Sequence, residues 1–124
     1  MLSALPSISM VIKENTLEDI LTDVCWALSY ISDQGEDRIP YIIETNITER
    51  LVELLDHENV AISIPCLRIL GNLVTGDDDQ TQSVLNCGAL IPMEKLLSST
   101  KKPVRKEVCW AVSNITAGNA IQIE

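Results

Sequence analysis

The chain has 124 residues, of which 46% are hydrophobic and 22% charged, and its formal net charge is -9. Phosphates of nucleic acid and anionic lipids repel so negative a chain, so composition favours a cationic partner, although acidic residues also serve solubility alone. Polar residues interrupt each apolar run well short of the roughly 20 residues of a membrane-spanning helix. The first residues lack the basic region and cleavage site of a secretory signal, which favours a cytoplasmic or nuclear protein.

The most regular feature is a repeat with a period of 42 residues. It relates three pairs of residues that have the same helical spacing: Trp26 with Tyr30, Arg68 with Asn72, and Trp110 with Asn114. Self-similarity at a period of roughly 40 to 47 residues is typical of armadillo and HEAT solenoids. About three such units fit into the chain.

Apolar residues recur at i, i+4, i+7, i+8 and i+11 in one long helix of each unit. These predicted core residues are Ile20, Val24, Ala27, Leu28, Ile31, Ile62, Cys66, Ile69, Leu70, Leu73, Val104, Val108, Ala111, Val112 and Ile115. In chain order, short helices are expected at about 4–13, 47–56 and 89–98, and a further small helix within each of 35–46 and 76–88. Gly35, Gly76 and Gly118 follow the long helices as expected C-caps, and Gly88 is expected to end the small helix before Ala89.

Three helices per unit indicate armadillo rather than HEAT repeats. The predicted fold is therefore an all-α, right-handed superhelical armadillo solenoid in a single domain (1–124), with repeats at about 1–34, 35–76 and 77–118 and the start of another at 119–124. Solenoids require polar capping repeats, which neither end of this sequence supplies. We therefore expect a slice of a longer array, or self-association through the uncapped ends.

The four cysteines are widely spaced and form no CxxC or Cys/His metal-binding pattern, so no metal or cofactor is expected. Cys25, Cys66 and Cys109 lie within the apolar helical pattern, where free cysteine behaves as a small buried residue. His57 is the one histidine. It lies in a turn and has no repeat-related partner for a catalytic triad, so an enzyme is not predicted.

A second stripe of side chains runs beside the predicted core of the last long helix. Glu107, Trp110 and Asn114 lie about 110° away from the core direction, at 100° per residue. Burial is the simpler interpretation of a tryptophan, but an amide on the same face would then be costly to bury. Asp23 precedes Trp26 as Glu107 precedes Trp110, and the middle repeat has a cation in the tryptophan position.

Stacked repeats would align these stripes into a ladder that suits an extended cationic peptide. Asparagine amides pair with a peptide backbone whatever its sequence. Indole rings cover the stems of Lys and Arg and attract their charges by about 0.5 to 2 kcal/mol per site. Carboxylates select for positive charge.

The stretches DVCWALSYISD, VELLDHENVAISIPCLRILGNLVTGDDDQTQ and LLSSTKKPVRKEVCWAVSNITAGN resemble the armadillo domain of importin alpha. The family recognises Lys/Arg-rich nuclear localisation signals and carries them with importin beta. The order Trp/Tyr, Arg/Asn, Trp/Asn resembles its fifth, sixth and seventh repeats. The resemblance implies a fragment of a nuclear import adaptor, found in cytoplasm and nucleus, that uses no cofactor.

The resemblance also implies which residues bind the peptide. Those of the minor signal-binding site are Asn72, Val74, Thr75, Gly76, Asp78, Thr81, Glu107, Trp110 and Asn114. Asp23 and Tyr30 resemble the edge of the major site, and Trp26 and Arg68 complete the predicted stripe. No importin-beta-binding basic segment precedes the repeats, and the repeats that hold most of the major site are absent. We therefore expect weak binding of signals and no recruitment of importin beta by this chain alone.

A generic armadillo scaffold that binds another extended partner, such as an acidic or phosphorylated tail, is the alternative. A local basic patch would serve that role: Arg68, Lys101, Lys102, Arg105 and Lys106. The carboxylates of Asp23, Asp78 and Glu107 would repel an anion. The two functions therefore differ in the charge of the peptide that is preferred.

Overall fold

The computed structural model describes residues 5–14, 17–34, 36–74 and 78–118, and for Leu5, Glu36, Asp78, Ala117 and Gly118 it describes the backbone alone. The elements in chain order are α1 (Leu5–Glu14), α2 (Glu18–Ser32), the 3-10 helix η2 (Glu36–Arg38), α3 (Ile39–Glu44), α4 (Thr48–Leu54), α5 (Val60–Leu73), α6 (Asp78–Asn86), α7 (Leu90–Leu96) and α8 (Lys102–Gly118). Every regular element among these residues is helical, as the all-α prediction requires. None of the described helices has the length and apolar character needed to cross a membrane.

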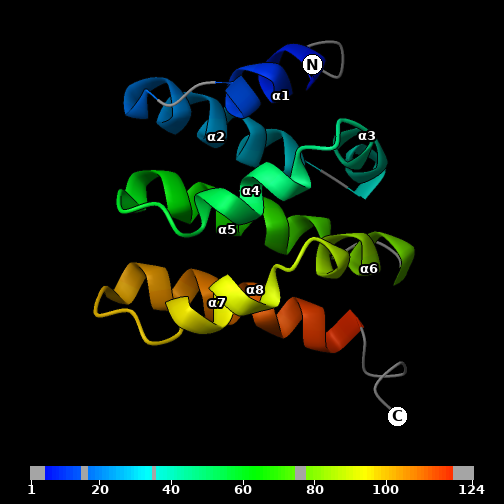
Figure 1. Cartoon of the computed structure of the whole chain (residues 1–124). Coiled ribbons are helices and arrows are strands. Elements are labelled where there is room, and N and C mark those ends of the chain that lie inside the picture. The colour runs from blue at the N-terminus through cyan, green and yellow to red at the C-terminus, as the bar shows by residue number, and fades with distance from the viewer. Residues whose placement is uncertain (1–4, 15–16, 35, 75–77, 119–124) are drawn as a thin grey trace.

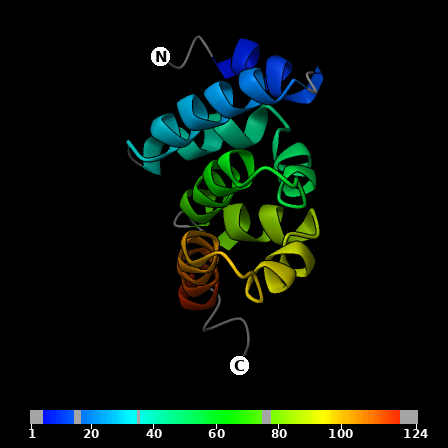
Figure 2. The ribbon, with the colours of Figure 1, turned by 90° about the vertical axis from the view of Figure 1, so that its left-hand side faces the viewer.

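The three longest helices, α2, α5 and α8, stack along the molecule (Figure 1). α4 and α7 lie beside α5 and α8, and α3 and α6 lie at the side of the stack, by one end of the long helices (Figures 1 and 2). α3–α5 and α6–α8 therefore form three-helix units, and α1 and α2 correspond to the last two helices of such a unit.

Local sequence explains where several helices begin and end. Asn59 caps α5, because its side chain accepts a hydrogen bond from the backbone N–H of Ala61 at 3.0 Å. Asn46, between α3 and α4, has a φ of 59°, and Gly88, between α6 and α7, has a φ of 77°. These two positions are 42 residues apart, so the same left-handed turn recurs in both units. Gly35 and Gly76 lie outside the described residues, and α8 extends to Gly118.

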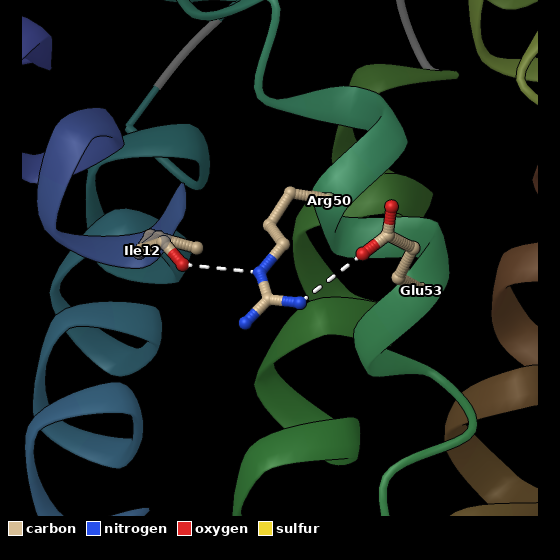
Figure 3. Close-up of polar contacts among 3 residues, drawn as sticks. All are labelled: Ile12, Arg50 and Glu53. Atoms are coloured by element: carbon tan, nitrogen blue, oxygen red, sulfur yellow. Dashed lines mark hydrogen bonds and ion pairs between the residues drawn. The ribbon is translucent and has the colours of Figure 1, made fainter. Parts of the chain in front are cut away.

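An arginine ties the first short helix to the next repeat. Arg50 on α4 donates from Nε to the carbonyl oxygen of Ile12 at 3.2 Å, and its Nη1 lies 3.1 Å from Oε2 of Glu53 (Figure 3). Ile12 lies in the last turn of α1, where carbonyl groups lack a partner within the helix. A cation there is favourable because it meets the negative end of the helix dipole.

The core prediction holds for α5 and fails for part of α2. All five predicted residues of α5 are buried. On α2, Leu28 and Ile31 are buried, whereas Ile20 and Ala27 are exposed, so their predicted burial is wrong. Leu21 and Cys25 are buried in their place.

The reason is that one face of each long helix points towards the preceding repeat and another face points towards the following repeat. Cys66 meets Cys25 of α2, so the stripe of α5 that includes Ile62 and Ile69 faces backwards along the chain. Ile20 and Ala27 occupy the same stripe of α2, and no described long helix precedes α2 to cover it. Cys109 is exposed on the forward face of α8 for the corresponding reason, so its predicted burial is also wrong.

Candidate peptide-binding surface

The predicted stripe residues come together from the three stacked helices α2, α5 and α8. We call the surface that they form the stripe surface; its residues include Trp26, Arg68 and Trp110. The two tryptophans are 40% and 39% exposed, which is high for side chains that are usually largely buried. Both indoles therefore pack against the stack and still offer surface to a partner.

Arg68 stands at the centre of this surface and joins all three helices. Its guanidinium carbon lies 5.5 Å from the ring centroid of Trp26 on α2. Its Nη2 donates a charge-assisted hydrogen bond to Oε1 of Glu107 on α8 at 2.5 Å. The side chain of Glu107 is mostly buried, so the arginine neutralises a carboxylate that was predicted to bind a cationic peptide.

Trp110 sits directly against the backbone of α5. A Cβ built on Gly71 would lie 2.4 Å from Cζ3 and 2.9 Å from Cε3 of the indole, closer than real Cβ contacts. Asn114, one turn further along α8, donates from Nδ2 to the carbonyl oxygen of Gly71 at 3.1 Å. The absence of a side chain at Gly71 thus allows the ring and the amide to dock on the same turn of α5.

The two asparagines of the stripe differ in their surroundings. Asn72 is buried, and its Nδ2 donates to Oγ of Ser32 at 2.9 Å, which links α5 to α2. Asn114 is only half-buried. A side-chain amide has two donors and a carbonyl acceptor, so Asn114 retains capacity for a peptide backbone after its bond to Gly71.

A depression of about 320 Å³ opens between Arg68 and Trp110. Asp33, Lys106 and Glu107 complete its lining. Asp33 and Lys106 were not among the residues predicted for the stripe. Helical spacing contained the signal, because Asp33 lies seven residues after Trp26 and Lys106 lies four before Trp110.

The other predicted residues lie in varied positions. Asp23 and Tyr30 are exposed on α2. Val74 and Thr81 are buried, and the Thr81 hydroxyl donates to the Val74 carbonyl at 3.3 Å. Thr75, Gly76 and the side chain of Asp78 lie outside the described residues. The structure thus brings together the stripe but places the side chains of Val74 and Thr81 beneath the surface.

The one histidine lies in the turn before α5, where its ring contacts the neighbouring backbone and a carboxylate. His57 Nδ1 accepts from the backbone N–H of Asn59 at 3.0 Å, and its Nε2 lies 3.9 Å from Oε1 of Glu18. Among the described residues, no three His, Cys, Asp or Glu side chains cluster as metal ligands would. The charged and aromatic groups of the stripe surface are suited to binding.

The sequence matches the family described as "Armadillo/beta-catenin-like repeat" over residues 35–75 and 77–117. It is 50% identical over 122 residues to importin subunit alpha-1a of Oryza sativa subsp. japonica, and 51% identical over 122 residues to importin subunit alpha-4 of Arabidopsis thaliana. Each alignment covers 98% of this chain, but the chain spans only 23% and 22% of the length of these relatives. The structure is similar, with a TM-score of 0.91 and 30% identity, to a designed armadillo repeat protein in complex with the peptide (KR)4. That match covers 98% of this chain and 50% of the designed one.

Proposed function

Because the chain belongs to the armadillo-repeat family, we propose that its stripe surface binds extended, Lys/Arg-rich peptides of the nuclear localisation signal type. In this proposal the chain is a fragment of an importin-alpha-like import adaptor that acts in the cytoplasm and the nucleus. It is a binding function without catalysis. Its similarity to importin alpha subunits over nearly the whole chain supports the choice of partner.

The contact of Arg68 with Trp26 and Glu107 is the observation that carries the proposal. An indole face on one side and a carboxylate on the other already hold one guanidinium on this surface. A peptide Lys or Arg requires the same two partners, because its apolar stem packs on a ring while its charge seeks an acceptor. The designed relative bound to (KR)4 has the same fold and a ligand of the same chemistry.

The place offered to a peptide lies beside Trp110. Trp110 and Asp33 both line the depression there, and Asn114 supplies an amide for the peptide backbone. Asp23 and Tyr30 on α2 would extend the contact along the same face. Val74 and Thr81 would contribute through backbone groups, since their side chains are buried.

Titration of a fluorescently labelled Lys/Arg-rich peptide tests the proposal. We expect Trp110→Ala to weaken binding roughly tenfold, consistent with a loss of 1–2 kcal/mol at one cation–π slot. The matched control is Tyr41→Ala, which removes an exposed aromatic ring from α3, outside the stripe surface, and should leave the affinity unchanged.

In the second part of the experiment, the salt concentration and the charge of the peptide are varied. Binding should weaken as salt rises, because charge complementarity contributes to it. Equal losses in both variants, or tighter binding of an acidic peptide than of a basic one, would contradict the proposal. Preference for the acidic peptide would support the alternative of a scaffold for another extended partner.

A further inference from the structure

A pair of cysteines meets inside the α2–α5 interface, away from the groups that the proposed function uses. Sγ of Cys25 lies 3.7 Å from Sγ of Cys66, and neither residue has exposed surface. The two residues come from neighbouring repeats and are 41 positions apart in the sequence. Sulfur atoms so close, from segments so distant, form a dithiol that the fold itself assembles.

The next interface of the stack shows that thiols are not needed for packing. Adding 42 residues to Cys25 and Cys66 gives Leu67 on α5 and Val108 on α8, which are both buried. An apolar pair therefore serves at the equivalent place. The chemistry of the sulfur atoms is what distinguishes the α2–α5 interface.

The two thiols are unequal. The hydrogen bond with Cys66 lowers the pKa of Cys25; burial opposes this effect, and the positive charge of Arg50, which Figure 3 shows on α4, adds to it. The same hydrogen bond raises the pKa of Cys66, and burial raises it further. Cys25 therefore loses its proton more readily than Cys66, and the thiolate is the form of cysteine that acts as a nucleophile.

We propose that Cys25 and Cys66 form a reversible disulfide when the protein meets hydrogen peroxide. The Cys25 thiolate attacks one peroxide oxygen, the O–O bond breaks, and the product is a Cys25 sulfenic acid, with the other oxygen leaving as water after protonation. The Cys66 sulfur then attacks the Cys25 sulfur, an S–S bond forms, and the hydroxyl leaves as water with the Cys66 proton. Two thiols lose two electrons, and one peroxide is reduced to two waters.

Geometry makes this pair the favoured partners once one sulfur is oxidised. A disulfide requires about 2.0 Å between sulfur atoms, so the two must approach by roughly 1.7 Å, within the range of side-chain rotation and a small shift of α2 against α5. Because both thiols are buried, peroxide reaches them through local opening of the interface. Reaction should therefore be slower here than at the exposed Cys109.

The bond would tie α2 to α5, the helices that carry Trp26 and Arg68. Closing a loop of this length restricts the unfolded chain, and we expect the midpoint of thermal unfolding to rise by roughly 10 °C in the oxidised protein. The rise should vanish on adding a thiol reductant. This expectation does not depend on the proposed peptide binding.

The experiment uses the full chain with Cys87→Ser and Cys109→Ser, so that only the buried pair remains. After treatment with hydrogen peroxide under native conditions, intact mass spectrometry should show the loss of two hydrogen atoms. A proteolytic digest should contain a peptide that links Cys25 to Cys66. The matched control adds Cys66→Val, which installs the residue found at the equivalent positions Val24 and Val108 and should abolish both the cross-link and the thermal shift.

Two results would overturn the proposal. One is a peroxide-treated protein that retains two free thiols, or accumulates a sulfinic acid at Cys25, while circular dichroism shows it folded. The other is a cross-link that appears only in denaturant, since the native interface would then play no part. If Cys66→Val does not fold, Cys25→Ser provides the same comparison from the other side of the interface.

Discussion

Replacing Gly71 by alanine tests how the stripe surface is built. The added Cβ would lie 2.4 Å from Cζ3 of Trp110, and the three nearest atoms to it all belong to that indole. The ring must move outwards, or α5 and α8 must separate. Gly71→Ala should therefore displace the side chain proposed to bind the peptide without changing any charge.

Two opposing terms set the expected change in the free energy of unfolding. Alanine in the middle of a helix is favoured over glycine by about 1 kcal/mol. Overpacking a tight contact costs about 1–3 kcal/mol. The net effect in the wild-type background is a loss of stability of up to about 2 kcal/mol, whereas in a Trp110→Ala background, where the ring is absent, the same substitution should stabilise by about 1 kcal/mol.

The double-mutant cycle of Gly71→Ala and Trp110→Ala isolates the contact as a coupling of about 1–3 kcal/mol. Urea unfolding followed by circular dichroism measures all four proteins. Peptide affinity provides a second readout, because a displaced ring should weaken binding as the loss of the ring does. Equal effects of Gly71→Ala in both backgrounds would refute the close approach of Trp110 to α5.

Three further substitutions test other parts of the structure. Arg68→Ala should cost about 1–2 kcal/mol of stability, because it leaves the mostly buried Glu107 carboxylate without its cation. It should also tighten a Lys-rich peptide roughly fivefold by vacating the Trp26 ring; weaker binding in the titration would instead make Arg68 a direct peptide contact. Cys66→Val should remove a loss of stability above pH 9.0. The folded thiol has the higher pKa, so it keeps its proton where the unfolded chain has released it, and the stability of the wild-type protein falls as pH rises. Denaturant unfolding at several alkaline pH values measures this effect, and identical pH profiles for the wild-type protein and the variant would refute it. Asn59→Ala should cost about 1 kcal/mol of stability by removing the cap of α5, and it should leave peptide affinity intact. Asn59→Asp should retain most of the stability. A parallel loss of affinity in the titration would show that binding depends on global stability.

Sequence periodicity was sufficient for the repeat and its helices. The 42-residue period relates Asn46 to Gly88, and both adopt the same left-handed turn because the same connection recurs. All five residues that the apolar spacing of α5 predicted to be buried are buried, since this helix has a long helix on each side. The pairing of Trp with Asn one turn later also placed Trp110 and Asn114 on one face, because residues four apart are neighbours on a helix.

Which faces meet across repeats was decided by the stacking of the helices. Periodicity assigned Ile20 and Cys109 to the apolar pattern but could not tell the forward from the backward face, and only a neighbouring helix buries either one. The neutralisation of Glu107 by Arg68 and the burial of Asn72 joined to Ser32 likewise depend on contacts between residues about 40 positions apart.

The sequence by itself therefore determined the repeat, the helical register and the residue types of the stripe, because these follow from spacing within one helix. The tertiary structure alone decided that Cys25 meets Cys66, that Gly71 receives Trp110, and that Arg68 lies between an indole and a carboxylate. Those contacts depend on the offset between neighbouring repeats. The packing of whole helix faces sets that offset, and no single spacing in the sequence records it.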